Sequence, residues 1–236
     1  MKEGYTTMRY GIIGAMQEEL DWLKSQIEIN EEVVVANCKF YIGSYGVHEV
    51  VLLQSGIGKV NAAMSTTILH ERFSPDYVIN TGSSGGVEPS LNVGDIVIGK
   101  ETIHHDADAT GFGYKYGQIP QMPETFSSNN ELIEKALQVK NVLPDNLQVT
   151  EGLIGTGDSF MSDLEHVNAV KEQLPNVKAL EMEAASIAQV CYQYDTPCLI
   201  IRSLSDIAGK ESNISFKEYL DEAAKNSASF ILEMLK

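Results

Sequence analysis

The stretch VKALEMEAASIAQVC, residues 177–191, carries two carboxylates among small and apolar side chains. They belong to Glu181 and Glu183, which flank Met182. Burying an unpaired charge costs free energy, so a segment that only filled a core would carry leucine or valine at these two positions. The pair therefore needs a chemical explanation.

The meaning of this pair depends on the element that carries it. Residues two apart share a face of a strand but not of a helix. A strand over 177–181 followed by a helix from about 184 places Glu183 at a strand's carboxyl end and beside a helix N-terminus. A carboxylate is favourable there, and open α/β sheets bind their ligands at that edge. Helix capping or a solvent-facing position is the alternative for one or both glutamates.

Other predicted strands also end in small or acidic residues. The stretches at these ends are GIIGAMQEE, which contains Glu18 and Glu19, then NTGSSGG, GTGDSFM and RSLSD. Because several strands of one sheet end in this way, we predict a shared pocket. The amides of TGSSGG could bind an anion or hydroxyl oxygens, and GTGDSFM could stack Phe160 on a planar ring. A tight turn is the alternative for each glycine stretch.

Short β-rich runs alternate with helical patterns, which predicts one α/β domain with a central mixed β-sheet flanked by helices. We assign this domain to residues 8–236 and interpret residues 1–7 as a leader or an alternative start. The predicted strands lie at 9–14, at two or three places within 32–55, and at 77–81, 94–100, 147–155, 177–181 and 197–204. The predicted helices lie at 18–27, 60–73, 129–139, from about 163, at 184–194 and at 216–235.

Two local patterns refine the helices. Capping-box spacings, Ser162-x-x-Glu165 and Ser215-x-x-Glu218, mark the starts near 163 and 216. The helix over 60–73 is expected to bury the face that carries Val60, Ala63, Met64, Thr67 and Ile68.

The composition is that of an ordinary globular chain with a strong acidic bias. The 236 residues carry a formal net charge of −16, whereas nucleic-acid and anionic-membrane surfaces need basic patches, so we expect a small-molecule partner. No signal-like apolar segment or membrane-spanning run is present in the sequence, and we expect a cytoplasmic protein. Three cysteines, Cys38, Cys191 and Cys198, lack metal-ligand spacing and are interpreted as reduced core thiols.

The stretch SGIGKVNAAM follows a predicted strand and opens a helix, as a dinucleotide-binding fingerprint does. Asn61 stands at the third glycine position, however, and Asp76 precedes its strand instead of ending it. We therefore disfavour a nicotinamide or flavin site.

The stretch HHDAD, residues 104–108, suggests a metal site. Adjacent histidines on one segment rarely converge on one ion without further ligands, and the remaining histidines lie on unrelated elements, at His48, His70 and His166. We favour a loop or interface role for HHDAD.

Taken together, eight stretches resemble the 5′-methylthioadenosine/S-adenosylhomocysteine nucleosidases of the nucleoside phosphorylase superfamily. They are GIIGAMQEE, SGIGKVNAA, INTGSSGG, VGDIVI, HHDADATGFGYKYGQIP, GTGDSFM, LEMEAASIA and RSLSD. The resemblance runs in register from Met8 to the C-terminus, with Ser84 where alanine is common and Gln17 where an acid is common. It implies a mixed α/β sheet flanked by helices, a homodimer, and no cofactor or metal.

The resemblance also implies roles for the acidic residues. Asp206 would protonate the departing purine at N7, which requires an acid that keeps its proton near neutral pH, as burial allows. Glu19 would be the base that positions the attacking water. Glu183 and the backbone of Met182 would hold the ribose hydroxyls, and Glu181 would be supportive.

The remaining implied site residues bind or orient the reactants. Ser83 and Arg202 would help to place the water, and Phe160 and Met161 would bracket the adenine. The other implied contacts to substrate are Met16, Ile57, Ser205 and Phe216 and, from the partner subunit, Phe112, Tyr114 and Pro120.

Two other functions fit part of this pattern. A purine nucleoside phosphorylase would share the fold, but phosphate recognition favours arginine forks, and the chain has only Arg9, Arg72 and Arg202, of which Arg202 alone lies at a predicted site. A nucleoside-binding module without catalysis would explain glycines and aromatic residues but not acids at three separate strand ends. Hydrolysis by water is the favoured interpretation.

Overall fold

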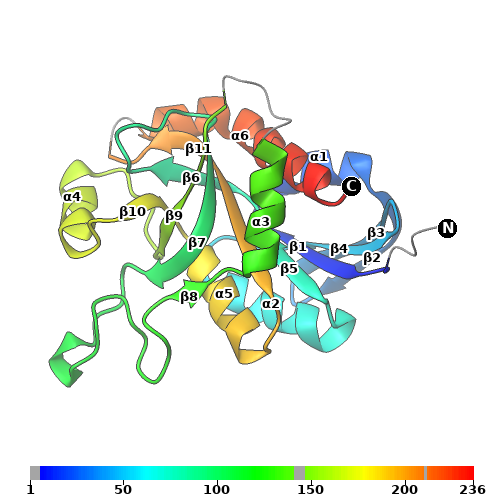
Figure 1. Ribbon diagram of the computed structural model, residues 1–236, viewed down its shortest axis with the longest axis horizontal. Coiled ribbons are helices and arrows are strands. Elements are labelled where there is room, and N and C mark those ends of the chain that lie inside the picture. The colour runs from blue at the N-terminus through cyan, green and yellow to red at the C-terminus, as the bar shows by residue number, and fades with distance from the viewer. Residues whose placement is uncertain (1–5, 141–146, 210–211) are drawn as a thin grey trace.

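A computed structural model describes residues 6–140, 147–209 and 212–236, without the side chains of residues 212–215. Of the predicted leader, residues 1–5 lie outside the described residues. An 11-stranded mixed sheet forms the centre, in the order β2-β3-β4-β1-β5-β11-β6-β10-β9-β7-β8 (Figure 1). The strands are Arg9–Gly14 (β1), Glu28–Val35 (β2), Cys38–Tyr45 (β3), His48–Gln54 (β4), Tyr77–Asn80 (β5), Ser83–Gly86 (β6), Ile96–His104 (β7), Phe126–Ser127 (β8), Val149–Thr156 (β9), Val177–Glu181 (β10) and Cys198–Ile207 (β11).

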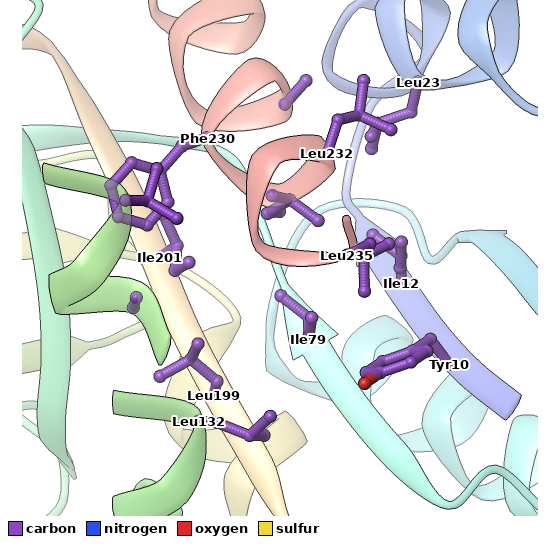
Figure 2. Close-up of a cluster of buried hydrophobic side chains, with 14 of the residues drawn as sticks. Tyr10, Ile12, Leu23, Ile79, Leu132, Leu199, Ile201, Phe230, Leu232 and Leu235 are labelled. Atoms are coloured by element: carbon purple, nitrogen blue, oxygen red, sulfur yellow. The ribbon is translucent and has the colours of Figure 1, made fainter. Parts of the chain in front are cut away.

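Helices cover both faces of the sheet, as the alternating pattern of the sequence predicts (Figure 1). They are Gln17–Gln26 (α1), Lys59–Phe73 (α2), Asn130–Val139 (α3), Leu164–Gln173 (α4), Ala184–Gln193 (α5) and Ser212–Met234 (α6), with a short 3-10 helix, Thr110–Phe112 (η1). The core beneath α1, α3 and α6 joins Tyr10, Ile12 and Ile79 of the sheet to Phe230 of α6 and to Leu235, which directly follows α6 (Figure 2). A second core lies beneath α2 and α5.

Strand β11 contributes to two cores because its side chains alternate between its faces. Leu199 and Ile201 pack beneath α3 and α6, whereas Ile200 and Leu204 face a third cluster. That cluster lies inside a closed ring, since β11 pairs with both β6 and β7, and the order β11-β6-β10-β9-β7 returns to β11. The ring brings β6, β10 and β11 together around the site described below.

The structure corrects one strand prediction. The glycine-rich stretch after β5 was predicted as a bend, but Ser83–Gly86 forms strand β6, parallel to β11 and antiparallel to β10. Glycine is favoured at Gly85 and Gly86 because a larger side chain at these positions would collide with Asp206 and Leu204. Close packing against neighbouring strands explains these glycines better than a turn does.

The predicted buried face of α2 is also wrong. Val60 and Met64 are exposed, and the buried side chains are those of Ala62, Ser65, Thr66, Leu69 and His70. The helix buries small and polar residues against α5 and the sheet, so hydrophobicity did not indicate the inward direction.

The capping-box predictions miss the helix starts slightly. Asp163, and not Ser162, caps α4, accepting a hydrogen bond from the His166 amide at 2.9 Å. Helix α6 begins at Ser212, four residues before the predicted start.

The three cysteines are buried and free, which confirms their interpretation as core thiols. Across the part of the chain that the structure describes, no helix has the length and apolar character needed to cross a membrane.

Candidate active site

A cavity of about 250 Å³ lies among the segment after β1, strand β6, the end of β10 and the end of β11. It brings together ten of the predicted site residues, namely Met16, Glu19, Ile57, Ser83, Phe160, Met182, Glu183, Ser205, Asp206 and Phe216. A smaller extension of about 30 Å³ adds Met161. The pocket predicted from separate strand ends therefore forms within one chain.

Glu19 reaches the cavity from the first turn of α1. Its Oε2 accepts hydrogen bonds from the amides of Ala15 at 2.7 Å and Met16 at 3.2 Å. Its Oε1 accepts from the Ser83 amide at 3.0 Å and from the Ser83 hydroxyl at 3.1 Å. These donors and the helix N-terminus stabilise a carboxylate in a buried position, and they aim Oε1 across the cavity.

Asp206 lies on the cavity wall near the end of β11 and is only 2% exposed. The Ser205 hydroxyl donates to its Oδ1 at 2.9 Å. Burial raises the pKa of Asp206 from 3.8 to about 6, although the Ser205 hydrogen bond opposes this change. A carboxyl group with this pKa keeps its proton to a far higher pH than an ordinary aspartate does, and roughly a tenth of it is still protonated at pH 7, so a general acid remains available.

Glu183 precedes α5 and faces the cavity beside the N-terminus of α2. Its Oε1 accepts a hydrogen bond from the Gly58 amide at 2.9 Å. Burial and the neighbouring Glu181 raise the pKa of Glu183 well above its ordinary value, against the opposing effect of Arg202. Gly58 adopts φ +94°, a left-handed backbone that favours glycine. Gly58 is the second glycine of the stretch SGIGKVNAAM. Its amide binds the Glu183 carboxyl group of the protein, and not the phosphate that the amides of a dinucleotide-binding fingerprint bind.

The other glutamate of the pair, Glu181, is occupied by protein partners. Its Oε2 accepts from the amides of Glu183 and Ala184, both at 2.9 Å, and from Arg202, while its Oε1 accepts from Thr156. Glu181 therefore holds the junction between β10 and α5, which agrees with the supportive role implied by the resemblance.

Arg202 does not line the cavity. Its fully buried guanidinium pairs with Glu181 and donates to Asn80 Oδ1 at 2.7 Å. It borders the cavity wall at Gly82, where an added Cβ would lie 2.3 Å from Arg202 Nη1 and 2.7 Å from Glu19 Oε1. Only glycine therefore fits between these two groups at this position.

Aromatic side chains cover the outer part of the cavity. The rings of Phe160 and Phe216 meet edge to face, with centroids 5.6 Å apart. Phe160 is partly exposed, as is Ile57. The Met161 carbonyl accepts from the Gly209 amide at 3.1 Å, which ties this loop to the segment before α6.

Three predicted site residues lie elsewhere. Phe112, Tyr114 and Pro120 belong to the segment between β7 and β8, which extends away from the body of the molecule (Figure 1). Phe112 is 88% exposed. None of the three lines the cavity of its own chain, and their assignment to a partner's cavity stays a prediction.

The sequence reasoning missed several lining residues. Ala15, Ser84, Gly85 and Leu180 line the cavity without having been predicted as site residues. Each lies within two residues of one that was named, so its place in a motif was the available signal. The role of Gly82 had no such signal, since it depends on two side chains from distant segments.

The HHDAD stretch lies at the end of β7 and after it, with both histidines buried. His104 Nε2 lies 3.0 Å from Gln189 Oε1, and burial lowers the pKa of both imidazoles. Among the described residues, no cluster of three potential metal-binding side chains occurs. The stretch was expected to have a loop or interface role: residues 105–108 do lie in a loop, His104 instead completes β7, and an interface role stays a prediction.

Comparisons with known proteins match nearly the whole chain. The family model described as "Phosphorylase superfamily" matches residues 9–236. The chain is 57% identical to the 5′-methylthioadenosine/S-adenosylhomocysteine nucleosidase of Geobacillus thermodenitrificans (strain NG80-2), over 97% of this chain and 96% of that protein. It is 54% identical to the protein of that name from Bacillus thuringiensis (strain Al Hakam), over 97% and 99% of the two chains.

Solved structures resemble the fold closely. A nucleosidase of the same name from Colwellia psychrerythraea 34H, in complex with adenine, superposes with a TM-score of 0.95 at 47% identity, covering 98% of this chain and 96% of that one. The Neisseria meningitidis nucleosidase, in complex with methylthio-immucillin-A, gives a TM-score of 0.95 at 45% identity, covering 97% and 99%.

Proposed function

Because the chain belongs to the phosphorylase superfamily and to its 5′-methylthioadenosine/S-adenosylhomocysteine nucleosidases, we propose that it hydrolyses an N-glycosidic bond. Its substrates are 5′-methylthioadenosine and S-adenosylhomocysteine, and its products are adenine and the matching 5-thio-ribose. The observation that carries this proposal is the convergence of Glu19, Glu183 and Asp206 on one cavity.

Asp206 acts as the general acid. Cleavage moves the bonding electron pair onto the purine, and a proton delivered to N7 neutralises the charge that develops there. The raised pKa of Asp206 supports this role, because an aspartate with an ordinary pKa would have lost its proton at neutral pH. The Ser205 hydroxyl fixes the orientation of the carboxyl group.

Glu19 positions and deprotonates the water that attacks the anomeric carbon. Its Oε1 and the Ser83 hydroxyl lie 3.1 Å apart at the cavity wall, and the hydroxyl can rotate to share a water between them. The nearby Arg202 guanidinium donates to the Thr81 carbonyl at 3.4 Å and orients Glu181.

Glu183 holds the sugar together with the backbone of Met182. As the base departs, the ribose becomes cationic, and the oxygens of the surrounding carboxyl groups favour that charge. Phe160 and Met161 bracket the adenine, while Met16, Ile57 and Phe216 contact the sugar and the apolar 5′ substituent.

The active unit is a homodimer in this proposal. The exposed Phe112, with Tyr114 and Pro120 on the same extended segment, completes the 5′ end of the partner's cavity. The exposure of Phe112 supports this assignment, because a large apolar side chain that extends from its own chain loses unfavourable contact with water when covered.

The phosphorylase alternative is weaker. Arg202 is engaged by Glu181, Arg9 pairs with Glu49 at the surface, and Arg72 is exposed on α2. A dianion would find acidic neighbours and no available arginine fork among these three side chains.

Adenine release from each substrate in phosphate-free buffer tests the proposal. We expect turnover without phosphate and no 5-thio-substituted ribose 1-phosphate when phosphate is added. A strict phosphate requirement would establish the phosphorylase instead. The matched variant is Asp206→Asn, which should still bind nucleoside but lose nearly all turnover; binding without turnover in the wild type would indicate a binding module.

A further inference from the structure

Two loops that line the cavity are joined at the surface by three charged residues that do not line it. The first loop carries Ile57 and Gly58 ahead of α2, and the second, residues 157–163, carries Phe160. Between them lie Lys59, Asp106 and Asp158, which we call the surface network.

Asp158 is the centre of the surface network. Its Oδ1 accepts a hydrogen bond from the Lys59 amide at 2.8 Å. This amide stands at the start of α2, where backbone N–H groups have no acceptor within the helix. Its own amide donates to Asp106 Oδ2 at 3.0 Å. The circuit closes where Lys59 Nζ meets Asp106 Oδ1 at 2.6 Å. One aspartate therefore connects three segments of the chain.

Two of the three connected segments reach the proposed chemistry within a residue or two. Gly58, adjacent to Lys59, donates its amide to Glu183, the residue that holds the ribose. Phe160, two residues after Asp158, lines the cavity at the nucleobase end. The surface network thus links the sugar-binding carboxylate to the aromatic cover of the base.

Gly58 makes the approach of these loops possible. Its φ of +94° turns the chain at the α2 N-terminus, and an added Cβ would lie 3.0 Å from Asp158 Oδ1. The two loops are thus in contact at this point, and a displacement of either one transmits to the other.

The charges of the surface network are partly exposed. Burial opposes ionisation of Asp106, but hydrogen bonds from Lys59 and the Asp158 amide outweigh it and lower the pKa of Asp106. Partial exposure limits the contribution of such a pair to stability. The surface network fixes two loops of the cavity relative to each other, so a role in positioning these loops fits it better than a role in stability.

We propose that Asp158 is a positioning residue for substrate binding, which holds the loop of Phe160 against the N-terminus of α2 and thereby keeps Phe160 and Glu183 at the spacing that an adenine nucleoside requires. It does not touch the substrate. This inference rests on the proposed function, because its test measures the hydrolysis of 5′-methylthioadenosine.

The test compares Asp158→Ala with Asp158→Asn and Asp163→Ala. Asparagine keeps an oxygen that accepts from the Lys59 amide, so it should restore most of the lost function. Asp163 lies at the other end of the same loop and caps α4 in the same way, through the His166 amide. Its alanine variant is therefore a matched control for the loss of a helix cap.

For Asp158→Ala we expect KM for 5′-methylthioadenosine to rise about tenfold, with kcat within about threefold of the wild type. The inhibition constant of adenine should rise in parallel, because the base cover is displaced. Both alanine variants lose a helix cap and should lower the melting temperature by about 3 °C. Asp163→Ala should nevertheless leave KM unchanged.

Kinetic constants of Asp158→Ala within twofold of the wild type would overturn the inference, as would equal KM changes in Asp158→Ala and Asp163→Ala. So would an Asp158→Asn variant no better than the alanine variant. A wild type that releases no adenine would refute the proposed function instead, and the adenine-binding measurement on all three variants would still decide the role of Asp158.

Discussion

Replacing Asp206 with asparagine should stabilise the protein at alkaline pH while removing its turnover. Asp206 is buried in the cavity wall, and its pKa is raised from 3.8 to about 6 by that burial. The native state therefore binds the proton more tightly than the unfolded chain does. Stability from this group is complete below pH 3.8 and is lost as the pH rises through about 6.

The size of the effect follows from the two pKa values. A tenfold change in an acid constant corresponds to about 1.4 kcal/mol, so the ionised carboxylate opposes folding by roughly 3 kcal/mol at pH 8. At pH 5 most native Asp206 is still protonated, and the same relation gives about 1.6 kcal/mol. Asparagine is uncharged at both pH values and keeps an oxygen for the Ser205 hydroxyl. The difference in unfolding free energy between variant and wild type should therefore grow by about 1.4 kcal/mol from pH 5 to pH 8.

Urea unfolding of both proteins at pH 5, 6.5 and 8 measures this difference. Asp95→Asn is the control, because Asp95 is buried outside the cavity and accepts hydrogen bonds from the amides of Asn92 at 2.7 Å and Gln148 at 3.0 Å. Its replacement should destabilise the protein at all three pH values. If the Asp206→Asn variant were no more stable than the wild type at pH 8, or if its advantage did not change with pH, burial of Asp206 would not be the source of its raised pKa.

Three further predictions concern the same site. The kcat/KM of the wild type should fall about tenfold per pH unit above about 6, as the acid Asp206 loses its proton; initial rates between pH 5 and 9 measure this, and a constant value up to pH 9 would contradict it. Glu181→Ala leaves the buried Arg202 with only the more distant Glu183 Oε2, at 3.7 Å, and should lower the unfolding free energy by about 3–5 kcal/mol in urea, whereas a loss below about 1 kcal/mol would show that the pair is dispensable. Gly82→Ala places a Cβ 2.3 Å from Arg202 Nη1 at a φ of +152° and should cost about 2–4 kcal/mol of stability with at least a hundredfold loss of turnover, while Gly46→Ala, at a φ of +57° in open space, should leave turnover unchanged.

Local patterns predicted most of the secondary structure correctly. The strand at 177–181 and the helix that follows it are found at Val177–Glu181 and Ala184–Gln193. Their periodicities differ and a charged pair marks their junction, so neighbouring residues were sufficient to separate them. The buried face of α2 was not predictable in this way. It consists of small and polar residues that pack against α5, so local hydrophobicity does not mark it.

The sequence by itself determined that acids and glycines stand at the ends of several strands, and hence that a polar site was to be expected in an α/β domain. Only the tertiary structure decided how Glu181 and Glu183 divide their tasks. Both line the cavity, but Glu181 is held by Arg202 and Thr156, residues 21 and 25 positions away in the chain, whereas the Glu183 carboxyl accepts from the Gly58 amide. The physical reason is that a carboxylate's role depends on the donors and charges around it, and folding brings those neighbours from distant segments.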